Sequence, residues 1–208
     1  MNITKIVLTG GPCGGKSTSL KAIREKFGEQ VLVVPEVATI LLSGGFPIPG
    51  QHVPFSPEWQ HAFQAAVAQV QQSLEQAYEL TAKAKGIRVL VCDRGLLDGA
   101  AYMPGGMGEF CQKFQIDQAE AHQRYAAVIH LESVATAQPE LYGKAGNESR
   151  YESLTEAQAL ELRSRKAWSD HPNWIFIQGG NGINSVTSQV MAAIYSQLHG
   201  EVPAPCDS

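Results

Sequence analysis

The segment TGGPCGGKST at residues 9–18 constrains the fold more than any other part of this chain. Gly10, Gly15, Lys16 and Ser17 match the pattern G-x-x-x-x-G-K-S/T, which is that of a phosphate-binding loop, or P-loop. In such a loop the glycines let backbone N–H groups turn toward phosphate oxygens, where a Cβ atom would block the approach. The pattern is informative only if a strand precedes it and a helix follows it.

Both flanks of the segment have the required character. Residues 3–8 (ITKIVL) form a short run with β-branched residues, which is typical of a buried strand. After the loop, Leu20, Ile23 and Phe27 recur three and four positions apart and predict a helix that ends at Gly28. The sequence therefore predicts a nucleotide site, with phosphates at the positive end of a helix dipole.

We expect the whole loop to contact the phosphates of ATP, with GTP as the alternative nucleotide. Lys16 would reach the β- and γ-phosphates as a point charge, and the Ser17 hydroxyl would ligate Mg²⁺. Cys13 is expected in the loop because it is small, and oxidation of its thiolate is the alternative. The expected contacts are Gly10, Gly11, Pro12, Cys13, Gly14, Gly15, Lys16, Ser17 and Thr18.

Short apolar runs alternate with helical stretches along the chain. The runs that indicate strands cover residues 3–8, 31–36, 87–92, 126–131 and 174–177. A serine–proline pair at 56–57 starts a long helix that reaches Lys85, and a capping box at 153–156 starts another that reaches Trp168. This order predicts an α/β class: a three-layer, kinase-like P-loop NTPase fold with a five-stranded parallel sheet.

The same reading predicts a single P-loop domain over residues 1–200, followed by a flexible tail at 201–208. Residues 44–85 would form an insert on the acceptor side, because the segment GGFPIPGQHVPF precedes the long helix and must be a loop. Residues 133–168 would form a flap or lid, which begins in a polar, turn-rich stretch.

Composition limits the classes of function. The formal net charge of −4 over 208 residues weighs against a nucleic-acid partner, because no basic field would gather phosphates along a groove. The four cysteines lack CxxC spacing, which disfavours zinc and suits reduced thiols. We see no signal-peptide pattern and no run of about 18 apolar residues. We therefore expect a cytoplasmic protein without membrane insertion, and the sequence leaves its oligomeric state open.

Acidic residues follow two of the predicted strands, where ligands bind in parallel sheets. Asp93 would hold Mg²⁺ through water or accept a proton from an acceptor hydroxyl, and Arg94 would contact a phosphate or the acceptor. Glu36 would orient or deprotonate the acceptor. The alternatives are a surface turn for Asp93 and Arg94, and a helix N-terminal acid that complements the dipole for Glu36.

The stretch between the fourth and fifth strands supplies a candidate flap arginine. Arg150 stands in a turn before the capping box and would stabilise charge on the transferring phosphate. Arg163 and Lys166 lie three apart on a helix that also carries Glu161, and a solvated charged face explains the two basic residues.

Histidines and aromatic residues carry weaker signals. The histidines lack metal-ligand spacing, and His130, on a buried strand, is expected to be a satisfied core residue. Trp59, Phe63 and Gln64 either line an acceptor pocket or belong to the core, and their helical spacing favours the core.

Several segments taken together resemble a known family: GGPCGGKST, PEVAT, CDRGLLDGAAYMP, HLESVATAQPELY, NESRYES and KAWSDHPNWIFI. They resemble the P-loop proteins described as AAA domain proteins, whose nucleotide domain is similar to the nicotinamide-riboside kinase domain of the bacterial NAD regulator. The resemblance covers nearly the whole chain. It implies the P-loop kinase fold, close to the deoxynucleoside and thymidylate kinases.

The resemblance implies roles at matching positions only. Asp93 and Arg94 match the acidic motif after the third strand, and Asp98 and Tyr102 of the same motif would shape the acceptor side. The flap motif would comprise Asn147, Arg150 and Glu152. After the fifth strand the chain reads FIQGGNG, where family members often read like VIDN. Because this loop usually passes near the base, the resemblance does not decide between ATP and GTP.

Two functions follow from these residues. The first is a kinase that passes the γ-phosphoryl group of Mg-ATP to a small hydroxyl acceptor, with a nucleoside or riboside as the first choice. The second is a nucleotide-binding switch that hydrolyses NTP slowly and regulates a protein or lipid partner. A kinase needs an enclosed acceptor pocket near the long helix, whereas a switch needs a segment that orders with the γ-phosphate.

Overall fold

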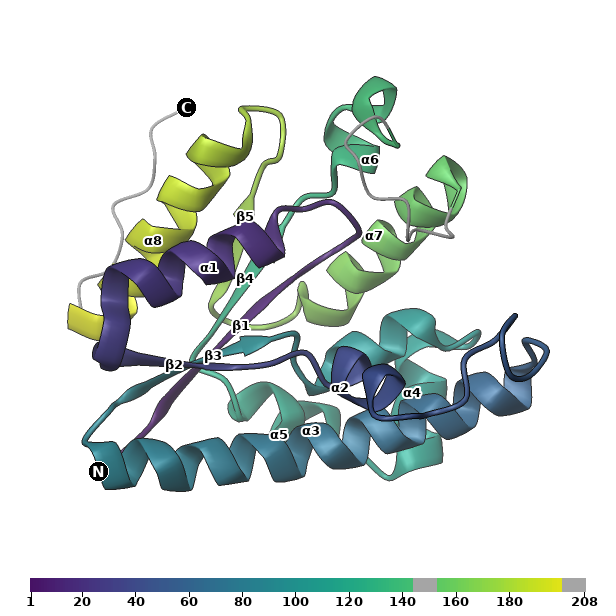
Figure 1. Ribbon diagram of the computed structural model, residues 1–208, viewed down its shortest axis with the longest axis horizontal. Helices are drawn as coiled ribbons and strands as arrows, with labels where there is room; N and C mark the ends of the chain where they lie inside the picture. The colour runs from purple at the N-terminus through teal and green to yellow at the C-terminus, as the bar shows by residue number, and fades with distance from the viewer. Residues whose placement is uncertain (144–152, 200–208) are drawn as a thin grey trace.

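The computed structural model describes residues 1–143 and 153–199. Five parallel strands form its central sheet: β1 (Thr4–Gly10), β2 (Val31–Val34), β3 (Val89–Asp93), β4 (Ala127–Leu131) and β5 (Trp174–Ile177). Their order is β2-β3-β1-β4-β5, as Figure 1 shows. The predicted α/β fold of the P-loop NTPase type, with its five-stranded parallel sheet, is confirmed.

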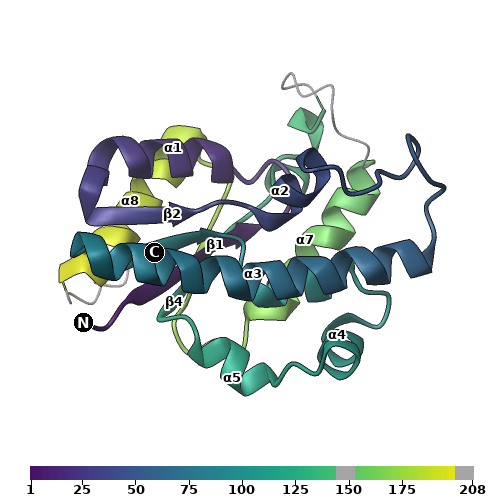
Figure 2. The same ribbon diagram turned by 60° about the horizontal axis from the view of Figure 1, so that its bottom comes forward.

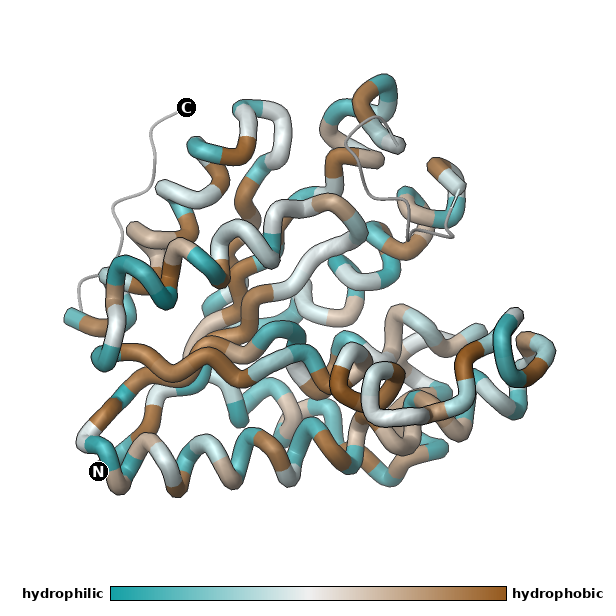
Figure 3. Tube along the Cα trace, viewed as in Figure 1, coloured by the Kyte–Doolittle hydropathy of each residue, from teal (hydrophilic) through white to brown (hydrophobic). Residues whose placement is uncertain are grey.

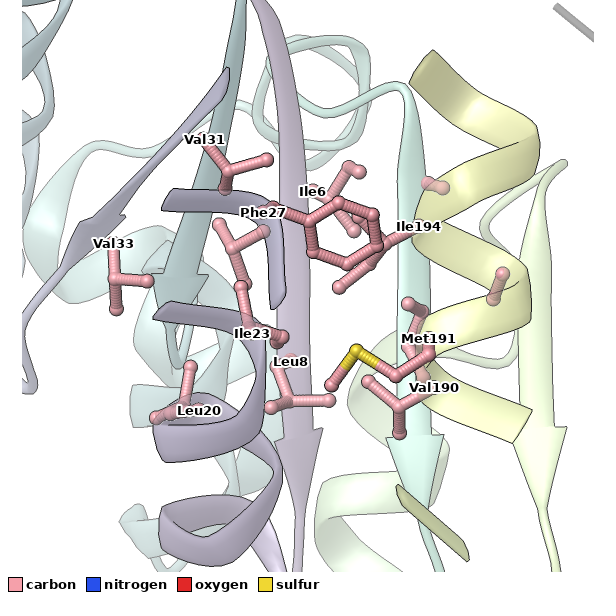
Figure 4. Packing of buried hydrophobic residues seen from close by; sticks show 14 of the residues in the cluster. Ile6, Leu8, Leu20, Ile23, Phe27, Val31, Val33, Val190, Met191 and Ile194 are labelled. Carbon is pink, nitrogen blue, oxygen red and sulfur yellow. The ribbon is translucent and has the colours of Figure 1, made fainter. Parts of the chain in front are cut away.

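Helices cover both faces of this sheet. One face carries α1 (Lys16–Phe27) and α8 (Ile183–His199), and the other carries α3 (Pro57–Lys85), α4 (Gly106–Phe114), α5 (Gln118–Gln123) and α7 (Leu154–Trp168). Figure 4 shows the first layer, where Phe27 of α1 and Met191 of α8 pack over Ile6 and Leu8 of β1. Strands that are covered on both faces have continuous apolar sequences, which is why the short runs were recognisable.

The capping residues that the sequence predicted stand at the ends of the observed helices. The Ser56 hydroxyl accepts the backbone N–H of Trp59 at the start of α3, and Ser153 forms a capping box with Glu156 at the start of α7. Gly28 ends α1. The remaining elements are η1 (Gly28–Gln30), α2 (Val37–Ser43), η2 (Leu96–Tyr102), α6 (Val134–Ala137) and η3 (Pro139–Leu141), where η denotes a 3₁₀ helix. Part of the stretch expected to be turn-rich therefore forms short helices.

Helix α3 buries a more polar face than its sequence predicts. Figure 3 shows mixed hydropathy along this helix, in contrast to the brown strands at the centre. Gln64, Gln71 and Glu75 are buried on α3, together with a few apolar residues. The Glu75 carboxylate accepts hydrogen bonds from the Tyr125 hydroxyl at 2.6 Å and from Lys5 Nζ at 3.1 Å, so the buried charge is paired.

Helices α2 and α3 lie beside the site at the carboxyl edge of the sheet. Figure 2 shows α2, which follows β2, lying over the long α3 helix. Within residues 1–143 and 153–199, no helix is long and apolar enough to cross a membrane.

Candidate functional site

The phosphate loop joins β1 to α1, as the pattern predicts, and its backbone turns sharply. Gly10 and Gly15 have φ values of 131° and 86°, and Cys13 has a φ of 62°, which is uncommon for a residue with a side chain. A Cβ atom on Gly10 would lie 2.1 Å from the carbonyl oxygen of Leu131 on β4, so only glycine fits there. Ser17 is exposed at the start of α1, where its hydroxyl is open to a ligand.

Lys16 folds back onto the loop. Its Nζ donates to the carbonyl oxygens of Gly10 and Gly11 at 2.8 and 2.9 Å. Burial and, after it, the nearby Arg94 guanidinium lower the pKa of Lys16 to about 8. A phosphate bound in the loop would favour the charged amine, because an opposite charge stabilises it.

Arg94 connects three parts of the site. It follows β3 with a φ of 69°, and its Nε donates to Glu36 Oε1 at 2.8 Å. Its Nη1 donates to Asp98 Oδ1 at 3.1 Å and lies 3.4 Å from the carbonyl oxygen of Gly10. One guanidinium thus joins the end of β2, the η2 helix and the phosphate loop.

Glu36 is the N-cap residue of α2. The alternative interpretation of Glu36, as an acid at the N-terminus of a helix, is therefore partly correct. Its carboxylate also binds Arg94, and Oε2 accepts the Thr39 hydroxyl at 2.6 Å. Burial alone would raise the pKa of Glu36, but Arg94 and Thr39 hold it below its ordinary value. Glu36 is therefore an ionised hydrogen-bond acceptor at neutral pH.

The Asp93 carboxylate is the acid of the site with the fewest stabilising contacts among the described residues. Burial and, after it, the neighbouring Glu36 carboxylate raise its pKa from 3.8 to about 6. No hydrogen bond to this carboxylate occurs among residues 1–143 and 153–199. A partly buried acid without donors beside a phosphate loop suits the partial ligation that Mg²⁺ prefers, with the phosphates and water supplying the other oxygens.

The donor set fits Mg²⁺ shared with a nucleotide rather than a metal cage. In the described part of the chain, no three His, Cys, Asp or Glu side chains are grouped so that they could hold a metal ion. Ser17 and Asp93 would supply the two protein oxygens, and bound Mg²⁺ would neutralise charge on the phosphates.

Asp98 and Tyr102 stand beside Arg94 on η2. Asp98 is 3% exposed and accepts four donors: the Thr9 hydroxyl, Arg94 Nη1, the Gly95 N–H and Trp168 Nε1. With its lone pairs engaged, Asp98 holds β1, η2 and α7 together. The Tyr102 ring lies 5.9 Å from the Arg94 guanidinium carbon.

A cavity of about 250 Å³ opens beside Glu36 and Arg94, between α2, α3 and η2. Its outer wall is aromatic, because Trp59 and Phe63 stack with their ring centroids 4.9 Å apart. The buried Gln64 also lines it, and Gln64 Oε1 has no hydrogen-bond partner among the described residues. These α3 side chains, which helical spacing assigned to the core, line a pocket.

Other sequence predictions have mixed outcomes. Asn147, Arg150 and Glu152 lie outside the described residues, so the flap motif stays a prediction. Arg163 and Lys166 are exposed, as a solvated face requires, but Glu161 on the same helix is fully buried. Glu161 does not belong to the solvated face, since its carboxylate contacts the phosphate loop and His130.

The sequence did contain a signal for Glu161. The buried positions of α7 include Ala157, Leu160, Ser164 and Trp168, and residue 161 falls on the same face at helical spacing. A lone carboxylate on an apolar helical face indicates a buried partner. His130 is fully buried, as expected for a core residue, and its Nε2 contacts that carboxylate.

A protein-family comparison matches residues 5–181 of the chain to the family described as AAA domain. The chain belongs to this family. The AAA domain match supports a P-loop, nucleotide-binding protein with NTPase or kinase activity in general. A comparison with curated protein sequences finds no match. The closer relation to nicotinamide-riboside kinase domains stays a prediction.

Proposed function

We propose that this AAA domain protein is a kinase that transfers the γ-phosphoryl group of Mg-ATP to a hydroxyl group of a small molecule. The observation that carries the proposal is the cavity of about 250 Å³ beside Glu36 and Arg94. It adjoins the phosphate loop through Arg94, which reaches the carbonyl oxygen of Gly10. A pocket for a second substrate next to a phosphate loop suits transfer between two bound molecules.

Glu36 and Asp93 would act on different substrates, Glu36 on the acceptor and Asp93 on the Mg²⁺ of the nucleotide. Glu36 lines the cavity and is ionised, so it would orient the acceptor hydroxyl and take its proton. The new P–O bond would form as the bond between the γ-phosphorus and the bridging oxygen breaks and ADP leaves. Asp93 does not line the cavity and would help hold Mg²⁺ with Ser17. Lys16 would stabilise charge on the β- and γ-phosphates, and Arg150 would do so from the flap.

The walls of the cavity favour an acceptor with a flat, uncharged ring, such as a nucleoside or riboside. Stacked Trp59 and Phe63 offer aromatic surface, and Glu36 and Arg94 neutralise each other. Gln64 supplies an amide that could bind a polar ring edge. We expect such a small molecule, and no nucleic acid, to be the partner of this site in the cytoplasm.

The test incubates the purified protein with Mg-ATP and with Mg-GTP against a panel of nucleosides, ribosides and small alcohols. Mass spectrometry detects any phosphorylated product, and Lys16→Ala is the control. A product that disappears in the control supports the kinase and identifies the acceptor and the preferred nucleotide. Absence of product despite tight Mg²⁺-dependent nucleotide binding would refute it and favour the switch with a protein or lipid partner.

A further inference from the structure

Helix α7 reaches the phosphate loop through one buried carboxylate. The backbone N–H of Gly11 donates to Glu161 Oε2 at 2.7 Å, although the two residues lie 150 positions apart. The Glu161 side chain is 0% exposed. A buried carboxylate that takes a backbone N–H is a strong, directional contact, because the acceptor is charged.

The identity of Gly11 follows from this contact. The P-loop pattern leaves the second position open, so phosphate binding alone does not require glycine there. A Cβ atom on Gly11 would lie 2.5 Å from Glu161 Oε2 and 3.1 Å from the Cβ atoms of Glu161 and Ser133. The backbone of Gly11 does not have a positive φ, so the close approach of Glu161 is the reason for glycine.

Glu161 is itself held in place. Its Oε1 lies 2.8 Å from His130 Nε2 and 3.6 Å from Arg165 Nη2. Burial alone would raise the pKa of Glu161, but the bonds from His130 and Gly11 and the charge of Arg165 keep it below its ordinary value. Because the carboxylate is only an acceptor, His130 must carry its proton on Nε2.

The peptide unit between Gly10 and Gly11 also holds Lys16. The N–H of this unit goes to Glu161, and its carbonyl oxygen accepts Lys16 Nζ at 2.8 Å and lies 3.4 Å from Arg94 Nη1. Fixing one side of a planar peptide fixes the other. The orientation of this peptide unit therefore helps to set the position of Lys16 Nζ before a nucleotide binds.

We propose that Glu161 is a positioning residue for nucleotide binding, which orients the Gly10–Gly11 peptide and, through it, Lys16. Without the carboxylate, the Gly11 N–H and the His130 Nε2–H lose their acceptor, and the peptide can rotate. The loop would then no longer be pre-organised, and the free-energy cost of ordering it would weaken nucleotide binding. This role rests on the nucleotide site of the proposed function and is independent of the acceptor.

The test measures the dissociation constants of Mg-ATP and Mg-GTP by calorimetry for a set of variants. Glu161→Ala should raise the Kd of the preferred nucleotide about tenfold, the size expected when part of one charge-assisted hydrogen bond is lost. Glu161→Gln should stay within about threefold of the natural protein, because its amide can still accept from Gly11 while His130 changes tautomer. Gly11→Ala should match Glu161→Ala, since its Cβ displaces the carboxylate.

A double variant and a buried-carboxylate control decide the origin of the effect. Gly11→Ala with Glu161→Ala should bind no more weakly than either single variant, since both break one contact. Glu75→Gln removes another fully buried carboxylate, on α3, and should lower thermal stability without changing the Kd. If Glu161→Ala does not fold, Gly11→Ala carries the test alone.

Three results would overturn the role of Glu161: an unchanged Kd in Gly11→Ala or Glu161→Ala, multiplied effects in the double variant, or an equal rise of the Kd in Glu75→Gln. Failure of the natural protein to bind either nucleotide would overturn the site and this role together. Tight binding with the expected variant pattern, but without any phosphorylated acceptor, would refute the kinase and leave Glu161 in its role.

Discussion

Replacing Asp93 by asparagine should stabilise the protein while removing its activity. The Asp93 carboxyl has a pKa of about 6 in the folded chain, against an ordinary value of 3.8, because it is buried and lies near Glu36. A carboxyl with a raised pKa binds its proton more tightly in the folded chain. The contribution of Asp93 to stability is therefore greatest below pH 3.8 and falls as the pH rises toward 6.

The size of the effect follows from the same two values. A rise from 3.8 to about 6 corresponds to about 3 kcal/mol of stability lost at neutral pH. Asparagine keeps a polar group in the same place, so part of the cost of burial remains. We therefore expect Asp93→Asn to gain about 2 kcal/mol in the free energy of unfolding at about pH 7.5, and almost nothing at about pH 3.5.

Urea unfolding of both proteins across this pH range measures the difference directly. The exposed Asp170 provides a control, and Asp170→Asn should leave the free energy of unfolding at about pH 7.5 within about 0.5 kcal/mol of the natural value. Adding Mg-ATP at about a hundred times its Kd should stabilise the natural protein by about 2.7 kcal/mol and the variant much less. An Asp93→Asn protein that is less stable than the natural one at neutral pH would refute the reasoning.

The remaining predictions concern turnover. The value of kcat/KM for the nucleotide should rise as Asp93 ionises near pH 6 and fall as Lys16 loses its proton near pH 8, which a pH profile of the initial rate checks. Trp59→Ala should raise the KM for the acceptor about tenfold and leave the KM for ATP unchanged; an equal rise of both constants would count against the pocket. Arg150→Ala should lower kcat more than it weakens ATP binding, and an unchanged kcat would remove it from the mechanism.

The sheet and the phosphate loop could be predicted because their signals are local. Each strand is a short apolar run, and the starts of α3 and α7 have their capping residues within three positions. Parallel register then places the strand ends together: Leu8 pairs with Asp93, and Val34 pairs with Cys92. Residues that follow these strands must meet at one edge, so the grouping of Glu36 and Arg94 near the loop was predictable.

The buried polar contacts could not be predicted in this way. On α3, Gln64, Gln71 and Glu75 occupy the inward face, although helical periodicity favours apolar residues there. Their burial depends on partners from other elements, such as Tyr125, which donates to Glu75 at 2.6 Å. Sequence spacing carries no information about a partner 50 positions away.

Asp98 illustrates how the charged residues of one sequence motif take different roles once the chain has folded. The segment DRGLLD suggested several acceptor-side residues, yet its three charged side chains differ in their bonding. Asp93 has no donor in the described part of the chain, Arg94 bridges Glu36 and Asp98, and Asp98 accepts donors from β1, η2 and α7. An acid with four donors cannot gain a ligand without losing one of them, whereas an acid with none can. The acid that is free to bind a ligand is therefore Asp93, and the structural role of Asp98 is what keeps Arg94 between the acceptor cavity and the phosphate loop.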